Sequence, residues 1–152
     1  MVFLKEGIKL PKIGKQLKQL RKREGYTQKQ MSVLLGFQGN PYSGYEYNRI
    51  KPSIENFVKL AKVLHTSVQY IVTGKELPEA FEEEVTPFPQ RLRELRERRN
   101  MTQQQVADCL DIRKATYQGY EYDKYEPKLD KLLKLADLFD VTLDELLGRN
   151  RT

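Results

Sequence analysis

Residues 102–122 have the sequence TQQQVADCLDIRKATYQGYEY and predict two helices separated by a short turn. Thr102 is a suitable N-cap, because its hydroxyl accepts from a backbone amide while the Gln105 side chain reaches back to the N-cap amide. The apolar face of the first helix consists of Val106, Ala107 and Leu110. Asp111-Ile112 forms the turn, and the next helix is expected at about 114–122.

Helical patterns continue on both sides of this segment. Leu92, Leu95 and Arg96 open an i, i+3, i+4 face that predicts a preceding helix. After it, Asp123–Pro127 is expected to be a loop, because proline disfavours a helical conformation in the residue before it. Two more amphipathic helices follow, and their apolar residues are Leu129, Leu132, Leu133, Leu135, Ala136 and Leu138, then Leu143, Leu146 and Leu147.

The same pattern occurs a second time, at an offset of about 75 residues and without a gap. Thr27-Gln28-x-Gln30 aligns with Thr102-Gln103-x-Gln105, and Tyr42-x-Gly44-Tyr45-Glu46-Tyr47 aligns with Tyr117-x-Gly119-Tyr120-Glu121-Tyr122. The apolar positions of the first copy are Met31, Leu34, Leu35, Ile54, Phe57, Val58, Leu60, Ala61, Val63 and Leu64. The chain therefore carries one helical fold twice.

These patterns predict an all-α protein with two tandem five-helix domains, at residues 1–74 and 88–152. Residues 75–87 form a short acidic linker that contains Pro78, Pro87 and the run Glu82–Glu84. Its composition favours a semi-extended, self-repelling tether, and a helical extension through 80–84 is the alternative. No strand pattern of any length is present, although Phe3-Leu4 and Ile8-Lys9-Leu10 could form a small extended arm.

The charge is unevenly distributed along the 152 residues, whose formal net charge is +6. Residues 1–74 carry 13 Lys or Arg and 4 Asp or Glu, residues 75–87 carry 1 and 5, and residues 88–152 carry 13 and 12. A basic half favours a polyanionic partner, because neutralising phosphates releases counterions. A solvated, soluble surface is the alternative explanation.

The sequence favours a cytoplasmic, non-enzymatic protein. No apolar run is long enough to span a bilayer, and Met1–Gly7 lacks the features of a signal peptide. Cys109 is the sole cysteine, so an intrachain disulfide is impossible. His65 is the sole histidine and lies near the end of an amphipathic helix, so we expect neither a metal cluster nor a Ser-His-Asp triad, and no cofactor.

The pattern Thr-Gln-x-x-apolar-Ala-x-x-Leu-x-apolar, followed by x-Tyr-Glu, a proline and Leu-x-x-Leu-Ala, resembles the phage-repressor and Cro-like helix-turn-helix family (XRE type). Residues 101–148 match closely, and residues 26–74 match less well. In the first copy Ser32 stands where alanine is usual, and Gln38-Gly39-Asn40-Pro41 replaces the ordinary helix start. The resemblance implies a lambda-repressor-like fold and a DNA-binding transcriptional regulator, most simply a repressor, at the bacterial or phage nucleoid.

In such a domain the third helix lies in the major groove, with its N-terminal residues facing base edges. Carrying the family's roles over by position gives base-reading candidates Arg113, Lys114, Ala115, Thr116 and Gln118 in the second copy, and Gln38, Asn40 and Ser43 in the first. Arg or Lys donates to guanine, Gln or Asn recognises adenine, and a methyl group contacts thymine. The alternative is that these are ordinary exposed polar residues.

The resemblance also implies DNA-backbone contacts and structural ion pairs. The backbone-contact candidates are Gln28, Gln103, Arg49, Lys51, Lys124, Lys128, Tyr47 and Tyr122. For the glutamines the alternative is a role in helix capping, and for the loop cations it is exposed salt bridging. The implied ion pairs, which tie the first helix to the third, are Arg21–Glu46 and Arg96–Glu121.

Aromatic and glycine positions recur in both third helices. Tyr42, Tyr45, Tyr117 and Tyr120 could stack on bases, but their spacing favours core packing. Gly44 and Gly119 each cost about 0.5–1 kcal/mol relative to alanine in a helix. Either close packing or close approach of the backbone to DNA must offset that cost, and the sequence does not choose between them.

Two function classes follow. In the first, the chain binds double-stranded DNA; the second copy supplies most of the specificity and the first most of the salt-sensitive affinity, either as a pseudo-dimer or in a homodimer. In the second, the chain is a protein-interaction module such as an antitoxin or anti-repressor, with one domain diverted from DNA. The first copy's cation-free third-helix start, residues 38–41, keeps this alternative open.

Overall fold

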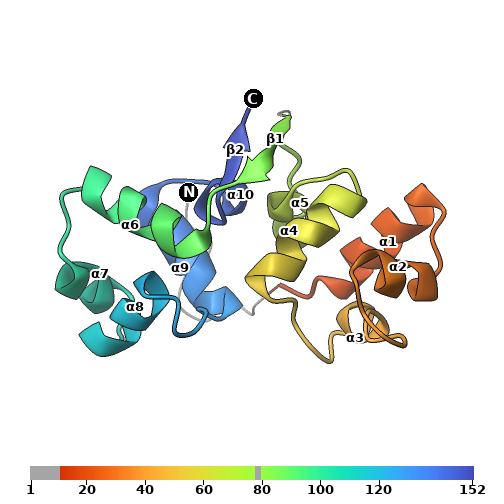
Figure 1. The fold of residues 1–152 in the computed structure, drawn as a ribbon, viewed down its shortest axis with the longest axis horizontal. Helices are drawn as coiled ribbons and strands as arrows, with labels where there is room; N and C mark the ends of the chain where they lie inside the picture. The colour runs from red at the N-terminus through yellow and green to blue at the C-terminus, as the bar shows by residue number, and fades with distance from the viewer. Residues whose placement is uncertain (1–10, 78–79) are drawn as a thin grey trace. The chain divides into compact units, whose positions relative to one another are not determined.

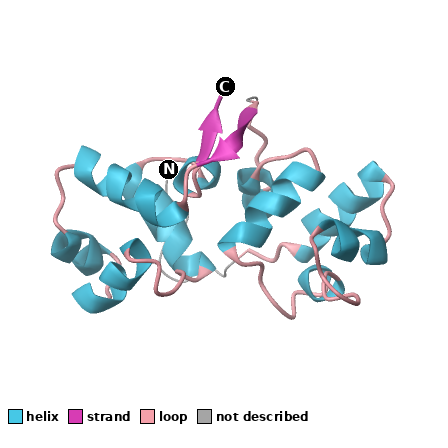
Figure 2. Cartoon of the chain, viewed as in Figure 1, coloured by secondary structure: helices cyan, strands magenta, loops and turns pink. Residues whose placement is uncertain are grey.

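The computed structural model describes residues 11–77 and 80–152, within which ten helices and one two-stranded sheet occur (Figures 1 and 2). These residues divide into two compact units, at 11–77 and 80–152. The expected all-α class is confirmed in its main feature, because helices dominate both units. The extended arm expected at Phe3-Leu4 and Ile8-Lys9-Leu10 lies outside the described residues.

The first unit consists of five helices. They are α1 (Gly14–Glu24), α2 (Gln28–Leu34), α3 (Ser43–Glu46), α4 (Ile54–Val63) and α5 (Val68–Thr73). The capping box predicted at the start of α2 is present: the Gln30 amide donates to the Thr27 hydroxyl over 3.1 Å, and the Thr27 amide donates to Gln30 Oε1 over 2.8 Å. Serine hydroxyls at Ser53 and Ser67 cap α4 and α5 in the same manner.

The second unit repeats the five helices and adds a small sheet. The helices are α6 (Phe88–Arg98), α7 (Gln103–Cys109), α8 (Lys114–Glu121), α9 (Leu129–Phe139) and α10 (Leu143–Leu146). Thr102 and Gln105 form the capping box expected before α7, and Thr142 with Glu145 forms another before α10. Satisfied N-terminal amides allow such short helices to begin at fixed residues.

Each unit has its own hydrophobic core, and nearly all the residues predicted to be apolar and inward-facing are buried. The four tyrosines expected in the core are also buried: Tyr42, Tyr45, Tyr117 and Tyr120. Leu34 is an exception, because 47% of its surface is exposed. Met31 and Leu35 already form the inward face of α2, one turn apart, so Leu34 points to solvent.

A short β-ribbon in the second unit corrects two expectations. β1 (Phe81–Val85) pairs antiparallel with β2 (Arg149–Arg151), so strands are present and this part of residues 75–87 is neither a free tether nor a helix. Arg149 anchors the ribbon: its guanidinium lies 4.1 Å from the Phe81 ring centroid and donates to Asp144 over 2.8 Å. The glutamates of β1 remain exposed between its half-buried ends.

Candidate nucleic-acid interface

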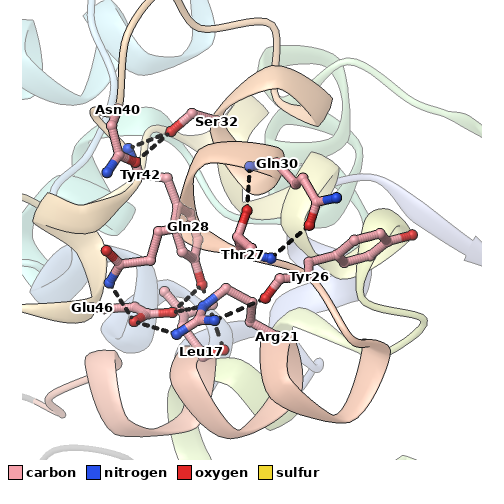
Figure 3. Close-up of polar contacts among 10 residues, drawn as sticks. All are labelled: Leu17, Arg21, Tyr26, Thr27, Gln28, Gln30, Ser32, Asn40, Tyr42 and Glu46. Carbon is pink, nitrogen blue, oxygen red and sulfur yellow. Dashed lines mark hydrogen bonds and ion pairs between the residues drawn. The ribbon is translucent and has the colours of Figure 1, made fainter.

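A buried carboxylate joins α1, α2 and α3 in the first unit (Figure 3). Glu46 Oε1 accepts from Arg21 Nε over 2.5 Å and from the Tyr42 hydroxyl over 2.9 Å. Its Oε2 accepts from Gln28 Nε2 over 2.8 Å. Arg21 also donates to the Tyr26 carbonyl over 2.8 Å. The four side chains fix the third helix against the first two.

The second unit builds the same network at the corresponding positions. Glu121 Oε1 accepts from Arg96 Nε over 2.6 Å and from the Tyr117 hydroxyl over 2.7 Å, while its Oε2 accepts from Gln103 Nε2 over 2.9 Å. The Glu121 side chain has no exposed surface, and that of Arg96 is 14% exposed. Both ion pairs expected from the sequence are thus present in the structure.

The network holds both carboxyl groups in the ionised form. Burial alone would raise the pKa of Glu121, but the hydrogen bonds from Arg96, Tyr117 and Gln103, together with the Arg96 charge, outweigh burial and lower it. The pKa of Glu46 is lowered for the same reasons. Because each carboxylate is already neutralised by its arginine, neither presents an unpaired negative charge beside the third helix.

Gln103 connects this network to the surface of α8. Its Nε2 donates a hydrogen bond to Glu121 Oε2, and its Oε1 accepts one from Gln118 Nε2 over 2.9 Å. The structure therefore brings together a predicted backbone-contact residue and a predicted base-reading residue. Ser43 holds the position of Gln118 in the first unit, and its hydroxyl instead donates to the Asn40 carbonyl over 3.1 Å.

The first turn of α8 presents two unengaged cations. Arg113 is the N-cap residue, Lys114 begins the helix, and neither side chain makes a hydrogen bond or ion pair with any residue in the described ranges. Both are exposed, as is Ala115, while Thr116 is half-buried. Arg113 and Thr116 line an open hollow together with Asp111 and Ile112. The surface that the sequence assigned to base reading is accessible.

The corresponding segment of the first unit is folded differently. The helix α3 has only four residues, so Gln38 and Asn40 precede it in an irregular segment. Ser32 is buried; its hydroxyl donates to Asn40 Oδ1 over 3.1 Å and accepts from the Tyr42 amide over 3.2 Å (Figure 3). Sequence reasoning missed this role of Ser32, although a polar residue at the place of Ala107 was a signal for it.

The remaining backbone-contact candidates lie in the loops after the third helices and are all exposed: Tyr47, Arg49, Lys51, Tyr122, Lys124 and Lys128. Arg49 lies over the Tyr47 ring, 5.2 Å from its centroid. The structure does not bring these residues into the buried networks. They form separate, solvent-facing positions in each unit.

Helix α1 carries a row of cations that the sequence analysis did not single out. Lys15, Lys18 and Lys22 are all exposed and lie at i, i+3 and i+7, which places them on one face. The corresponding residues of α6 are Gln90, Arg93 and Glu97. Helical spacing of the lysines was the available signal. The first unit thus has a basic face on α1, whereas the corresponding positions of α6 hold a single cation.

Comparison with known proteins places the chain in a family. The model of the helix-turn-helix family matches residues 17–71 and again residues 92–146, which together exceed half of the chain. The chain belongs to the helix-turn-helix family and contains its domain twice. No helix in the described residues is both long enough and apolar enough to cross a membrane.

Individual relatives match over about the length of one domain. The HTH-type transcriptional regulator AnsR of Bacillus subtilis (strain 168) is 54% identical over 61 residues, 40% of this chain and 53% of AnsR. The cryptic phage CTXphi transcriptional repressor RstR of Vibrio cholerae is 35% identical over 65 residues, 43% and 59% of the two chains.

The HTH-type transcriptional activator BcrR of Enterococcus faecalis is 35% identical over 61 residues, 40% of this chain and 30% of BcrR. The chain spans about half the length of the curated relatives it matches. These relatives are named as transcriptional regulators rather than as enzymes.

Proposed function

We propose that this protein binds a specific double-stranded DNA sequence and represses transcription, with α8 laid in the major groove. The observation that carries the proposal is the pair of exposed, unengaged cations, Arg113 and Lys114, at the first turn of α8. Cations at that position donate to guanine O6 and N7 when the helix enters the groove. The family assignment supports this docking mode.

The buried network supports the proposal because it leaves the exposed surface free for DNA. Gln103 fixes Gln118 through one hydrogen bond, so Gln118 retains its Oε1 and a second N–H for an adenine edge. A side chain held in place before binding loses less conformational entropy when it reaches its base. The second unit is therefore prepared for direct readout.

The first unit is suited to contacts with the phosphate backbone. Its third helix is short and is preceded by a segment without cations, whereas α1 presents Lys15, Lys18 and Lys22 on one exposed face. Phosphate contacts carry little sequence information and weaken steeply with salt. We infer that the second unit supplies most of the specificity and the first most of the salt-sensitive affinity. One chain then acts as a pseudo-dimer on sites about 10 base pairs apart, or two chains bind as a homodimer.

Repression is the regulatory outcome that we favour. RstR is named a repressor, and a protein that fills the major groove at a promoter excludes other proteins from it. BcrR is named an activator, so activation is the outcome against which repression must be tested. A reporter gene under the selected binding site should lose expression when the protein is supplied. Increased expression would contradict repression and leave DNA binding intact.

The test of base reading compares Arg113→Ala/Lys114→Ala with Lys59→Ala/Lys62→Ala, which removes the same charge from exposed positions of α4. Loss of one bidentate base contact should weaken cognate binding by about 1–3 kcal/mol, or roughly 5- to 150-fold, and relax the preference at one base pair. The α4 variant should keep the wild-type preference. Equal preference and affinity in both variants would contradict the assignment.

A protein-interaction module is the second candidate, and one observation favours it. Val33 and Leu34 of α2 are 67% and 47% exposed, where the second copy has Asp108 and Cys109. Exposed apolar side chains on a helix favour a protein partner for the first unit. A gel shift of the intact chain on random-sequence duplexes separates the two candidates. No retardation at low salt would favour the interaction module.

A further inference from the structure

The loop after α8 folds back onto the middle of that helix. Asp123 adopts a left-handed conformation with φ 57°, which ends the helix and reverses the chain direction. The Lys124 amide then donates to the Gly119 carbonyl over 2.9 Å. This turn places Tyr125 directly over Gly119.

The contact between Tyr125 and α8 requires glycine at position 119. A Cβ atom there would lie 2.2 Å from Cζ of the Tyr125 ring, far closer than van der Waals contact allows. The ring also packs edge-on against Tyr120, with the centroids 5.8 Å apart. Of the two explanations open for Gly119, the structure therefore supports close packing. Tyr125 nevertheless keeps 49% of its surface exposed.

The Tyr125 hydroxyl reaches the first turn of α8. It donates to the Ala115 carbonyl over 3.2 Å, adding a hydrogen bond to the turn that carries Lys114. The residue thus spans α8 from Gly119 to Ala115 along one side. First turns are the least restrained part of a short helix, because their amides have no helical partners.

The first unit provides a natural comparison. Ile50 occupies the position of Tyr125, and a Cβ at Gly44 would lie 2.9 Å from Ile50 Cγ1. Isoleucine packs on the glycine but has no hydroxyl to donate. In that unit the helix begins only at Ser43, and the positions equivalent to Arg113–Thr116 are not helical.

We propose that Tyr125 is a positioning residue for base readout, which holds the first turn of α8 through its hydroxyl bond to Ala115. This inference rests on the proposed function, because it assigns how Arg113 and Lys114 are aimed. Reading side chains must be held to within about 0.5 Å of their productive geometry. Tyr125 acts through the backbone of α8 and does not itself read a base.

The test uses the full-length Tyr125→Phe variant, which keeps the ring on Gly119 and removes only the hydroxyl. Tyr70→Phe is the matched control, because Tyr70 lies on α5, is not among the DNA-contact candidates, and its hydroxyl bonds to none of the described residues. Each protein is taken through selection of bound sequences from a random duplex library and through amide hydrogen exchange without DNA. Tyr125→Phe should bind the wild-type site about five-fold more weakly, as expected for one lost hydrogen bond.

Two further results are expected of Tyr125→Phe. Base preference should relax only at the positions that Arg113→Ala/Lys114→Ala also relaxes, and exchange should accelerate in α8 of the free protein. Uniform weakening with unchanged preference would overturn the proposal and indicate a direct phosphate contact. Unchanged binding and exchange would also overturn it.

The outcomes separate this inference from the proposed function. If the wild type selects no sequence, sequence-specific binding fails, while the exchange measurement still tests the restraint of α8 by itself. If Tyr125→Phe proves unstable, Tyr125→Ile reproduces the arrangement of the first unit. That variant should pack on Gly119, retain binding to random duplex, and lose the same base preferences. Retained preferences in Tyr125→Ile would contradict the role of the hydroxyl.

Discussion

Glu121→Ala should destabilise the second unit severely. The substitution removes the acceptor for Arg96, Tyr117 and Gln103 at once and leaves the Arg96 guanidinium without its counter-charge. Breaking a buried pair by removing one partner costs about 3–5 kcal/mol. Arg96 keeps its bond to the Met101 carbonyl and a small exposed surface, so the lower end, about 3 kcal/mol, applies here.

For a domain of this size, a loss of about 3 kcal/mol lowers Tm by on the order of 15 °C. Differential scanning calorimetry of the intact chain measures this shift, and region-resolved hydrogen exchange assigns it to residues 80–152. Glu97→Ala is the control, because Glu97 is an exposed carboxylate on the same helix as Arg96. A Tm within about 2 °C of wild type, together with altered base preference, would refute the structural role and make Glu121 a DNA-facing residue.

Three further predictions concern buried polar side chains of the two units. The contribution of Glu46 and Glu121 to the free energy of unfolding should be constant above the ordinary Glu pKa of 4.5 and should fall as the pH drops through their lowered pKa; urea titrations should show a smaller fall in the double Gln variant. Burial and the adjacent Glu121 carboxylate raise the pKa of the Tyr117 phenol. The neutral phenol should therefore stabilise the fold fully below pH 10, and this contribution should be lost as the pH rises further. Ultraviolet titration should show this phenol ionising only with unfolding. Ser32→Ala should cost about 1 kcal/mol by thermal melting, because the Tyr42 amide loses its acceptor, whereas Ser43→Ala should cost less; equal losses would contradict this.

Much of the helical fold could be predicted because its determinants are local in sequence. Thr102 and Gln105 lie three residues apart, and the capping box they predict is the one observed. The β-ribbon could not be predicted in this manner. Phe81 pairs with Arg151 across most of the second unit, and β2 has only three residues, too few for an alternating pattern.

In the candidate site, too, some features could be predicted from the sequence and others could not. The family resemblance implied that Arg96 pairs with Glu121, because family positions are fixed by the shared fold, and the structure contains that pair. The contacts of Ser32 and Tyr125 depend on side chains that meet only after the turns are formed. The family resemblance therefore identified Arg113 and Lys114, which are exposed at the start of α8, but not the neighbours that hold that helix in place.

Selection of bound sequences by the wild type and two variants tests whether the second unit reads bases. Sequences bound by the intact wild type, by Arg113→Ala/Lys114→Ala and by Gln38→Ala/Asn40→Ala are selected from a random duplex library and compared. We predict one enriched motif for the wild type, its loss or relaxation in the Arg113/Lys114 variant, and its retention in the Gln38/Asn40 variant. No enrichment by the wild type, or a motif that depends on Gln38 and Asn40 alone, would contradict base reading by the second unit.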